Sequence, residues 1–173
     1  MGFFDKLFGG KSKDENTAKF TNQSKTVLTP LQGKVLAQAD IPDETFAQGI
    51  LGPGCGIEPT GDTVYAPFDG TVNQVASTLH AVGLTSEDGM EILIHVGMDT
   101  VEMNGNGFKA LVKVGDKVKA GTPLLKVDLE AIRAAGHPTA TALIVTNSDD
   151  LPEISVAANG DAAAGTPVFK FKK

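Results

Sequence analysis

The sequence predicts an all-β protein, an antiparallel β-sandwich or barrel with a few short helical turns. From residue 26 onward, short apolar runs such as TVLTP, EILIHV and ALIVT recur at intervals of about eight to twelve residues. Each run is bounded by Gly, Pro, Asn or Asp, the residues that turns prefer. Short strands at such regular intervals are typical of sandwiches and barrels.

Composition narrows the function classes. The chain has 173 residues, 41% hydrophobic and 21% charged, which suits one compact soluble domain. A formal net charge of −6 argues against a nucleic-acid surface, because phosphate backbones attract clustered Lys and Arg. Arg133 is the only arginine, so an anion clamp of several guanidiniums is excluded. The single Cys55 excludes an internal disulfide and indicates a buried apolar thiol in a reducing compartment.

We expect residues 1–25 to form a flexible N-terminal tail and residues 26–173 to form one domain. The opening MGFFDKLF places its apolar side chains on one face of a short amphipathic segment, and a polar linker follows. Two interpretations stay open, a frayed terminus and a weak peripheral membrane contact. No apolar run approaches the ~20 residues of a membrane span, and no signal peptide is evident. We therefore expect a cytoplasmic protein.

Two short helical segments are predicted inside the domain. Asp128 is a suitable N-cap for a helix over residues 129–135, with Gly136 after its end and Pro138 preventing its continuation. A shorter helical turn is predicted over residues 43–48.

Two pairs of internal matches indicate a duplicated β unit. GDKVKAGTPLL, from Gly115, resembles GDAAAGTPVF, from Gly160, and TPLQGKV, from Thr29, resembles APFDGTV, from Ala66. We expect each Gly to adopt the positive φ of a turn and each Pro to begin a strand. The matches are short, so convergent turn chemistry stays open as the alternative.

Two of the chain's three histidines flank a predicted hairpin turn. In MEILIHVG, Glu91, Leu93 and His95 alternate with core-facing residues, so His95 lies on the less buried face. Thr78 and His80 share a face of the preceding strand. Whether the two histidine faces coincide depends on the turn.

The length of that turn decides whether the imidazoles meet. A four-residue loop, SEDG, pairs Thr85 with Met90 and puts His80 directly opposite His95. A two-residue Asp-Gly turn of the favoured primed type puts them on a diagonal. A three-residue loop would send them to opposite faces, and a shared site would fail. We expect one of the first two registers.

Two neighbouring imidazoles suit several kinds of chemistry. Coincidence, metal binding and nucleophilic or acid–base chemistry all stay open on pattern alone. A permanent zinc site needs a third ligand, for which Asp99 and His137 are candidates, although nothing ties His137 to this face. Nucleophilic chemistry needs no metal, because an imidazole with a pKa of about 6.5 is mostly unprotonated, and therefore nucleophilic, at cytoplasmic pH. One ring could carry a phosphoryl group while the other ring and the Thr78 hydroxyl bind its oxygens.

The segment LIHVGMDTVEMNGNGF, residues 93–108, closely resembles the active-site signature of the glucose-type enzyme IIA family of the bacterial sugar phosphotransferase system. STLHAVGL, IPDETFAQGILGPGCGIEPT and VYAPFDGTV resemble the same family, in the same order. The resemblance extends from about residue 26 to residue 173. It implies an antiparallel sandwich or barrel of the duplicated hybrid-motif type, in a free-standing form.

The resemblance also implies roles for individual residues. His95 would be the phosphoacceptor, taking phosphate from phospho-HPr and passing it to a sugar-specific IIB domain for coupled sugar uptake. His80 would stabilise the phosphate, with Thr78 in support. The rim that docks partner proteins would include Asp43, Phe46, Asp99 and Val101. No cofactor is required, but His80 and His95 could share a zinc ion with a carboxylate of a regulatory partner.

Three rival functions are weighed against this one. A zinc peptidase is similar at HVGMD, but it needs a later His-x-His pair that the chain lacks. A lipoyl or biotinyl carrier is similar at VKVGDKVKAGTPLLKV, but the chain lacks the lysine of its turn. A non-transferring regulatory protein would use the same docking face, which the intact His80 and His95 disfavour. The sugar and its IIB partner stay open.

Overall fold

The computed structural model describes residues 20–23, 25–147, 154–156 and 160–171. The predicted amphipathic segment at the start of the chain lies outside these ranges. Within them, no helix is both long enough and apolar enough to cross a membrane.

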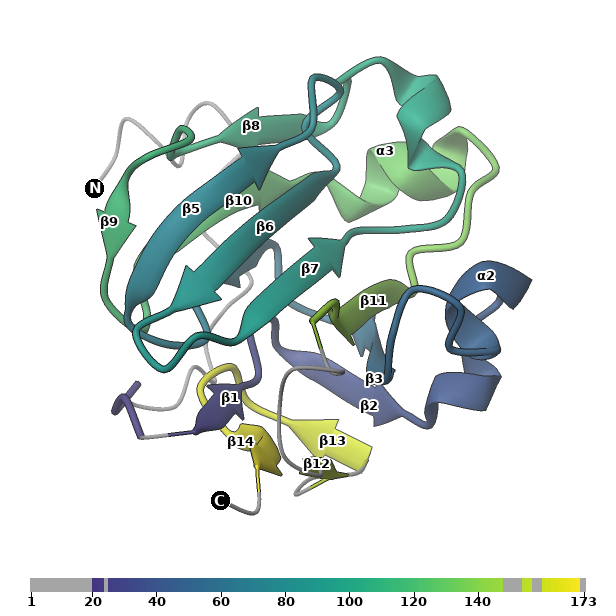
Figure 1. The fold of residues 1–173 in the computed structure, drawn as a ribbon. Coiled ribbons are helices and arrows are strands. Elements are labelled where there is room, and N and C mark those ends of the chain that lie inside the picture. The colour runs from purple at the N-terminus through teal and green to yellow at the C-terminus, as the bar shows by residue number, and fades with distance from the viewer. Residues whose placement is uncertain (1–19, 24, 148–153, 157–159, 172–173) are drawn as a thin grey trace.

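The chain forms short strands arranged in antiparallel sheets (Figure 1). The eight-stranded sheet has the order β13-β2-β3-β11-β7-β6-β5-β9. One three-stranded sheet has the order β4-β10-β8 and the other β1-β14-β12. The bounds are β1 Thr26–Leu28, β2 Gly33–Leu36, β3 Gly54–Pro59, β4 Thr63–Tyr65, β5 Gly70–Val75, β6 Ala81–Ser86, β7 Glu91–His95, β8 Phe108–Ala110, β9 Lys117–Val118, β10 Pro123–Val127, β11 Thr141–Val145, β12 Ile154–Val156, β13 Gly160–Ala162 and β14 Pro167–Phe171. The prediction of an antiparallel all-β fold is confirmed.

Short helices connect some of the strands. They are η1 Gln38–Asp40, α2 Glu44–Ala47, η2 Thr100–Met103 and α3 Leu129–Ala134. The Asp128 carboxylate accepts the Ala131 N–H at 3.1 Å, and the Asp43 carboxylate accepts the Thr45 N–H at 2.9 Å. Each carboxylate satisfies a backbone donor that a helix N-terminus leaves unpaired. The predicted N-cap Asp128 and the predicted helical turn at residues 43–48 are therefore confirmed.

The core follows from strand alternation. On β7, Ile92 and Ile94 are buried in the main core, while Leu93 and His95 point to the other face and are half-buried. The central strand β11 is buried on both faces, which explains why four of the five residues of TALIV are apolar and why its polar residue, Thr141, is buried with them. On one face, the side chains of β11 pack with those of the neighbouring strands in the main core. Its other face carries a satellite cluster, made of Ile41, Phe46, Met98, Ala142 and Ile144.

Hydrogen bonds between the two halves repeat across a pseudo-twofold relation. Leu28 N donates to the Pro67 carbonyl, and Tyr65 N donates to the Pro30 carbonyl. Leu28 and Tyr65 each come just before one of the matching segments, TPLQGKV and APFDGTV, and Pro30 and Pro67 are the second residues of these segments. The second bond is therefore the first one with the two halves interchanged. The sheet order is also palindromic, because β2 and β5 lie second from either end. Convergent turn chemistry would not reproduce pairing on this scale, so we conclude that the β unit is duplicated.

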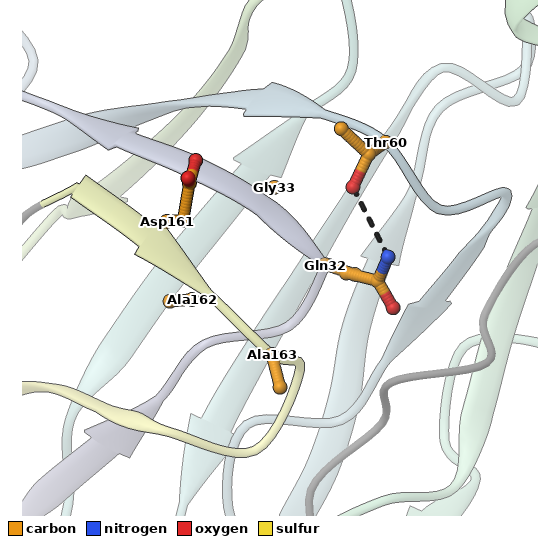
Figure 2. Close-up of a pocket in the computed structure, with 6 residues that line it drawn as sticks. All are labelled: Gln32, Gly33, Thr60, Asp161, Ala162 and Ala163. Atoms are coloured by element: carbon orange, nitrogen blue, oxygen red, sulfur yellow. Dashed lines mark hydrogen bonds between the residues drawn. The ribbon is translucent and has the colours of Figure 1, made fainter.

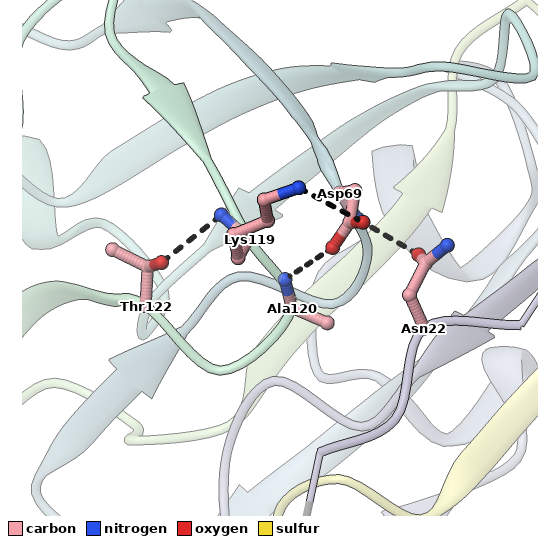
Figure 3. Close-up of polar contacts among 5 residues, drawn as sticks. All are labelled: Asn22, Asp69, Lys119, Ala120 and Thr122. Atoms are coloured by element: carbon pink, nitrogen blue, oxygen red, sulfur yellow. Dashed lines mark hydrogen bonds and ion pairs between the residues drawn. The ribbon is translucent and has the colours of Figure 1, made fainter.

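Equivalent turns of the two halves differ in their polar contacts. Figure 2 shows Gln32 beside β2 and β13, with its amide donating to the Thr60 hydroxyl at 3.1 Å. In the other half the equivalent residue is Asp69, which accepts the Ala120 N–H at 2.8 Å and lies 3.8 Å from the Lys119 ammonium (Figure 3). The same backbone turn is thus held by a neutral contact in one copy and by a charged one in the other.

The glycines of the repeats serve two different purposes. Gly115 and Gly160 have φ of 96° and 79°, as the turn prediction requires. Gly33 and Gly70 do not have positive φ, so that part of the prediction is wrong. A Cβ on Gly33 would overlap the carbonyl oxygen of Glu58, and one on Gly70 would overlap that of Thr85. These two glycines are needed because neighbouring backbones approach closely.

Candidate functional site

Ser86 N donates to the Met90 carbonyl at 2.8 Å, next to the Thr85–Glu91 pair, so the turn between β6 and β7 has three residues, 87–89, and both predicted registers are wrong. Along the two strands Ala81 pairs with His95, and Val82 with Ile94. If β6 continued unbroken toward its N-terminal side, alternation would place His80 on the face opposite His95.

The two imidazoles nevertheless lie together. Their ring centroids are 4.7 Å apart, and the planes meet edge to face at 82°. His80 lies in a bend just before β6, and the preceding Leu79 has a φ of 65°. Strand alternation therefore does not govern its side chain. His80 and His95 share a site as predicted, but by a route that the sequence did not indicate.

The hydrogen bonding of His95 defines its reactive nitrogen. Its Nδ1 lies 2.9 Å from the carbonyl oxygen of Gly97. Because a carbonyl only accepts, Nδ1 carries the proton, and Nε2 of the neutral ring keeps a free lone pair. Gly97 has a φ of 73°, and the Thr100 hydroxyl donates to the Val96 carbonyl at 2.6 Å within the same turn. Sequence reasoning missed this contact, although the Gly two residues after His95 was its signal.

His80 is held by the residue two positions before it. It is 7% exposed, and its Nδ1 lies 2.8 Å from the Thr78 hydroxyl oxygen, as the sequence predicted. When that hydroxyl donates, Nε2 of His80 carries the ring proton and is a hydrogen-bond donor. His80 can then donate to an anion on the neighbouring ring.

Both imidazoles are kept neutral by their surroundings. Burial is the main cause that lowers the pKa of His95, and the adjacent His80 lowers this pKa further. The hydrogen bond to Gly97 and the charge of Asp43 act in the opposite direction. Burial also lowers the pKa of His80, against a hydrogen bond to the Thr78 backbone. At pH 7 both rings are therefore unprotonated bases, as a nitrogen nucleophile requires.

The four residues predicted to form the docking rim occupy different environments. Phe46 is only 6% exposed, and its ring centroid lies 4.9 Å from that of His95. It is a wall of the site, because α2 folds onto the satellite cluster. Asp43 is half-buried as the cap of α2, whereas Asp99 and Val101, at the start of η2, are exposed.

Two further apolar residues are exposed in the loop after α2. Ile50 and Leu51 lie three and four residues beyond its last residue, Ala47, and are 67% and 42% exposed, comparable with Val101 at 51%. Sequence reasoning missed them. Their signal was a pair of apolar residues in a Gly- and Pro-rich stretch without strand alternation.

The described residues show no metal centre within this chain. No three His, Cys, Asp or Glu side chains in that part of the chain gather closely enough to hold a metal ion, so neither Asp99 nor His137 completes a set with His80 and His95. Cys55 is buried, and burial raises the pKa of its thiol to about 12, as expected for an unreactive apolar residue.

Comparison with known proteins decides which chemistry the paired imidazoles serve. A family model described as "phosphoenolpyruvate-dependent sugar phosphotransferase system, EIIA 1" matches residues 25–151, a range that contains both histidines. The chain belongs to this EIIA family. EIIA proteins are phosphotransferases that carry a phosphoryl group on a histidine, so the predicted function of phosphoryl carrier is confirmed.

Several relatives match the EIIA chain over most of its length. It is 42% identical to the glucose-specific EIIA component of Halalkalibacterium halodurans, covering 94% of this chain and 93% of that one. It is 44% identical to the β-glucoside-specific EIIBCA component of Dickeya chrysanthemi over 86% of this chain, but it spans only 24% of that longer protein. Among solved structures, the glucose permease IIA of Mycoplasma capricolum matches with a TM-score of 0.80 at 32% identity, covering 88% of this chain and 98% of that one.

Proposed function

We propose that Nε2 of His95 is the atom that carries the phosphoryl group of this EIIA protein. The observation that supports this assignment is the 2.9 Å hydrogen bond from Nδ1 to the Gly97 carbonyl, which leaves Nε2 with the lone pair. We assign His80 to bind the phosphoryl oxygens, because its ring centroid lies 4.7 Å from that of His95. Thr78 would hold His80 in the orientation that this role needs.

The transfer follows from these assignments. The Nε2 lone pair of His95 attacks phosphorus in a phosphohistidine of HPr. A new N–P bond forms while the old one breaks, and its electron pair returns to the donor imidazole. The phosphoryl group then carries about two negative charges, which a proton on His80 stabilises by a charge-assisted hydrogen bond. The cysteine thiolate of a IIB domain attacks the same phosphorus next and restores neutral His95.

The site suits a carrier because it binds phosphate only moderately. The chain's single arginine, Arg133, is paired with Glu130 on α3, at 3.2 Å. We infer that the guanidinium which in-line phosphoryl transfer commonly uses comes from the partner. Asp43 and Asp99 would attract such a positively charged partner, and the exposed Ile50, Leu51 and Val101 would contact its apolar surface.

The sugar and the compartment are also proposals. The glucose-specific and β-glucoside-specific names of the relatives support a IIB partner of the glucose type, working with this chain in the cytoplasm. Residues 26–173 would be the carrier domain. Residues 1–25 would precede it as a tail whose first, amphipathic segment makes weak membrane contact, while its end contacts the domain, since Phe20 packs against Tyr65 and Asn22 accepts the Asp69 N–H at 2.8 Å.

Separate measurements of the two transfer steps test the site assignment. Labelled phosphoenolpyruvate, enzyme I and HPr are mixed with the protein, and forward transfer is followed after adding a purified IIB domain. His95→Ala is expected to abolish labelling. His80→Ala is expected to accept the label and pass it on poorly. His137→Ala is the matched control and should behave as the unsubstituted protein. Undiminished labelling of His95→Ala would refute the assignment, and equal losses in both steps for His80→Ala would make His80 structural.

Zinc is a secondary proposal. Two adjacent imidazoles could fill two positions of a tetrahedral zinc site if a regulatory partner supplied a carboxylate. Zinc should then strengthen binding to that partner, with no such effect in His80→Ala.

A further inference from the structure

Leu79 has a backbone conformation that its residue type seldom adopts. Its φ is 65°, in the left-handed region that crowds Cβ against the backbone. Among the described non-glycine residues, positive φ occurs otherwise only at Lys25, Asp99 and Asn104. Asp and Asn commonly occupy this region, whereas a branched apolar residue such as Leu is unusual there. Strain of this kind persists where the surroundings impose it, often at functional sites.

The conformation at Leu79 has a direct effect on the direction of His80. The register puts Ala81 opposite His95, on the outer face of β6 and β7. A regular strand would turn the preceding side chain to the other face, with buried Val82. The bend at Leu79 and His80 breaks this alternation and brings the two rings edge to face.

Hydrogen bonds on both sides of Leu79 hold the bend. Leu79 N donates to the Ala76 carbonyl at 2.8 Å, and Ala76 N donates to the Ala81 carbonyl at 2.9 Å. The His80 carbonyl accepts the Val96 N–H at 2.8 Å, which fastens the bend to the strand end that bears His95. The hairpin therefore imposes the backbone angle at residue 79.

The side chain of Leu79 contributes packing. It is half-buried and packs against the main core. A Cβ on Gly105 would lie 3.8 Å from its Cδ1, so the loop after η2 also lies against it. Residue 79 can therefore act through the packing of its apolar side chain or through its left-handed backbone. Substitutions that keep one property and remove the other distinguish these two roles.

We propose that Leu79 is a positioning residue for phosphoryl transfer, and that its left-handed backbone turns His80 onto the face of His95. This inference rests on the proposed roles of His95 and His80. Its consequence is that the φ of residue 79 determines how well phosphate is passed on, and that the apolar side chain is secondary.

A pair of substitutions separates backbone from packing. Leu79→Asn removes the apolar side chain but favours left-handed φ, while Leu79→Val keeps apolar character and disfavours that φ. Leu79→Val is expected to accept phosphate from HPr at a near-normal rate and to transfer it to IIB roughly tenfold more slowly. Leu79→Asn and Leu79→Gly are expected to transfer at near-normal rates. If folded Leu79→Asn or Leu79→Gly transfers as slowly as His80→Ala, the inference is overturned, whether or not Leu79→Val folds.

An NMR titration of the unphosphorylated proteins adds a readout that general destabilisation would not move. The nearby His80 lowers the pKa of His95, so displacement of His80 in Leu79→Val should raise the His95 pKa, and Leu79→Asn should leave it unchanged. An unchanged His95 pKa in Leu79→Val would contradict the inference. The His95→Ala protein keeps the two proposals apart. If it still accepts label, the proposed function fails. If it is inert while Leu79→Val transfers normally, only the role of Leu79 fails.

Discussion

The Phe46→Ala variant should lose stability and change the titration of His95 together. Phe46 is 6% exposed and belongs to the satellite cluster on the outer face of β11. Truncating a buried Phe to Ala typically costs about 3–5 kcal/mol. The satellite cluster has only five buried residues, so its neighbours can partly collapse into the space. We therefore expect a loss of about 3 kcal/mol in the free energy of unfolding.

The same substitution removes the ring that packs against His95, with centroids 4.9 Å apart. Burial is the largest cause of the lowered pKa of His95, so water entering the vacated space should raise this pKa toward its ordinary value of about 6.5. At pH values below 7 the variant should then accept phosphate more slowly than the unsubstituted protein, because a larger fraction of its His95 rings is protonated.

Urea unfolding followed by far-UV circular dichroism gives the stability change, and NMR titration of the imidazole C–H signals gives the pKa. Ile132→Ala is the matched control, since Ile132 is fully buried in the main core on α3. It should also destabilise the fold, by about 2–5 kcal/mol, and leave the pKa of His95 unchanged. An unshifted pKa in Phe46→Ala, or an equal shift in Ile132→Ala, would refute the proposed link between this wall and the histidine.

Two further predictions concern acid stability and the repeated glycines. Because the pKa of His95 is lowered in the folded state, the unfolded chain binds more protons, so the free energy of unfolding should fall as pH drops through 6.5 toward the folded pKa. Urea titrations at several pH values should show a shallower fall for His95→Gln, and an unchanged slope would contradict this. Gly33→Ala and Gly70→Ala should each cost about 2–3 kcal/mol, because an added Cβ overlaps a neighbouring carbonyl. Gly115→Ala, whose Cβ meets nothing within 4 Å, should cost only the ~1–2 kcal/mol of left-handed backbone in thermal or urea unfolding, and the reverse ranking would count against the packing described.

Local chemistry explains what could be predicted from the sequence. Strands were predictable because alternation and turn residues act over a few positions, and EILIH shows the burial pattern that its alternation requires. The cap Asp128 was predictable for the same reason, since its side chain reaches a backbone donor within three residues.

The failures come from contacts that local patterns do not encode. The Ser86 hydroxyl accepts the N–H groups of Asp88 and Met90, at 3.2 and 3.0 Å, and so favours a three-residue loop instead of the two- or four-residue loop expected from the sequence. In this register, His80 on a regular strand would point away from His95. The left-handed backbone of Leu79 turns it back to the same face, and a Leu in the sequence does not indicate positive φ. Phe46 is buried through tertiary packing on β11, so its matching a docking motif did not disclose its environment.

The pairing of the first and last described strands bears on how this domain can be joined to others. Thr26 of β1 lies opposite Lys170 of β14, so both ends of the domain emerge side by side (Figure 1). Lys25 N donates to the Asp88 carboxylate at 2.8 Å, in the loop at the end of β7 remote from His95. A further domain joined to either end would therefore begin at the edge of the domain that is remote from His95. The domain can therefore stand alone or be joined to further domains, and in both cases the junction lies away from the paired histidines.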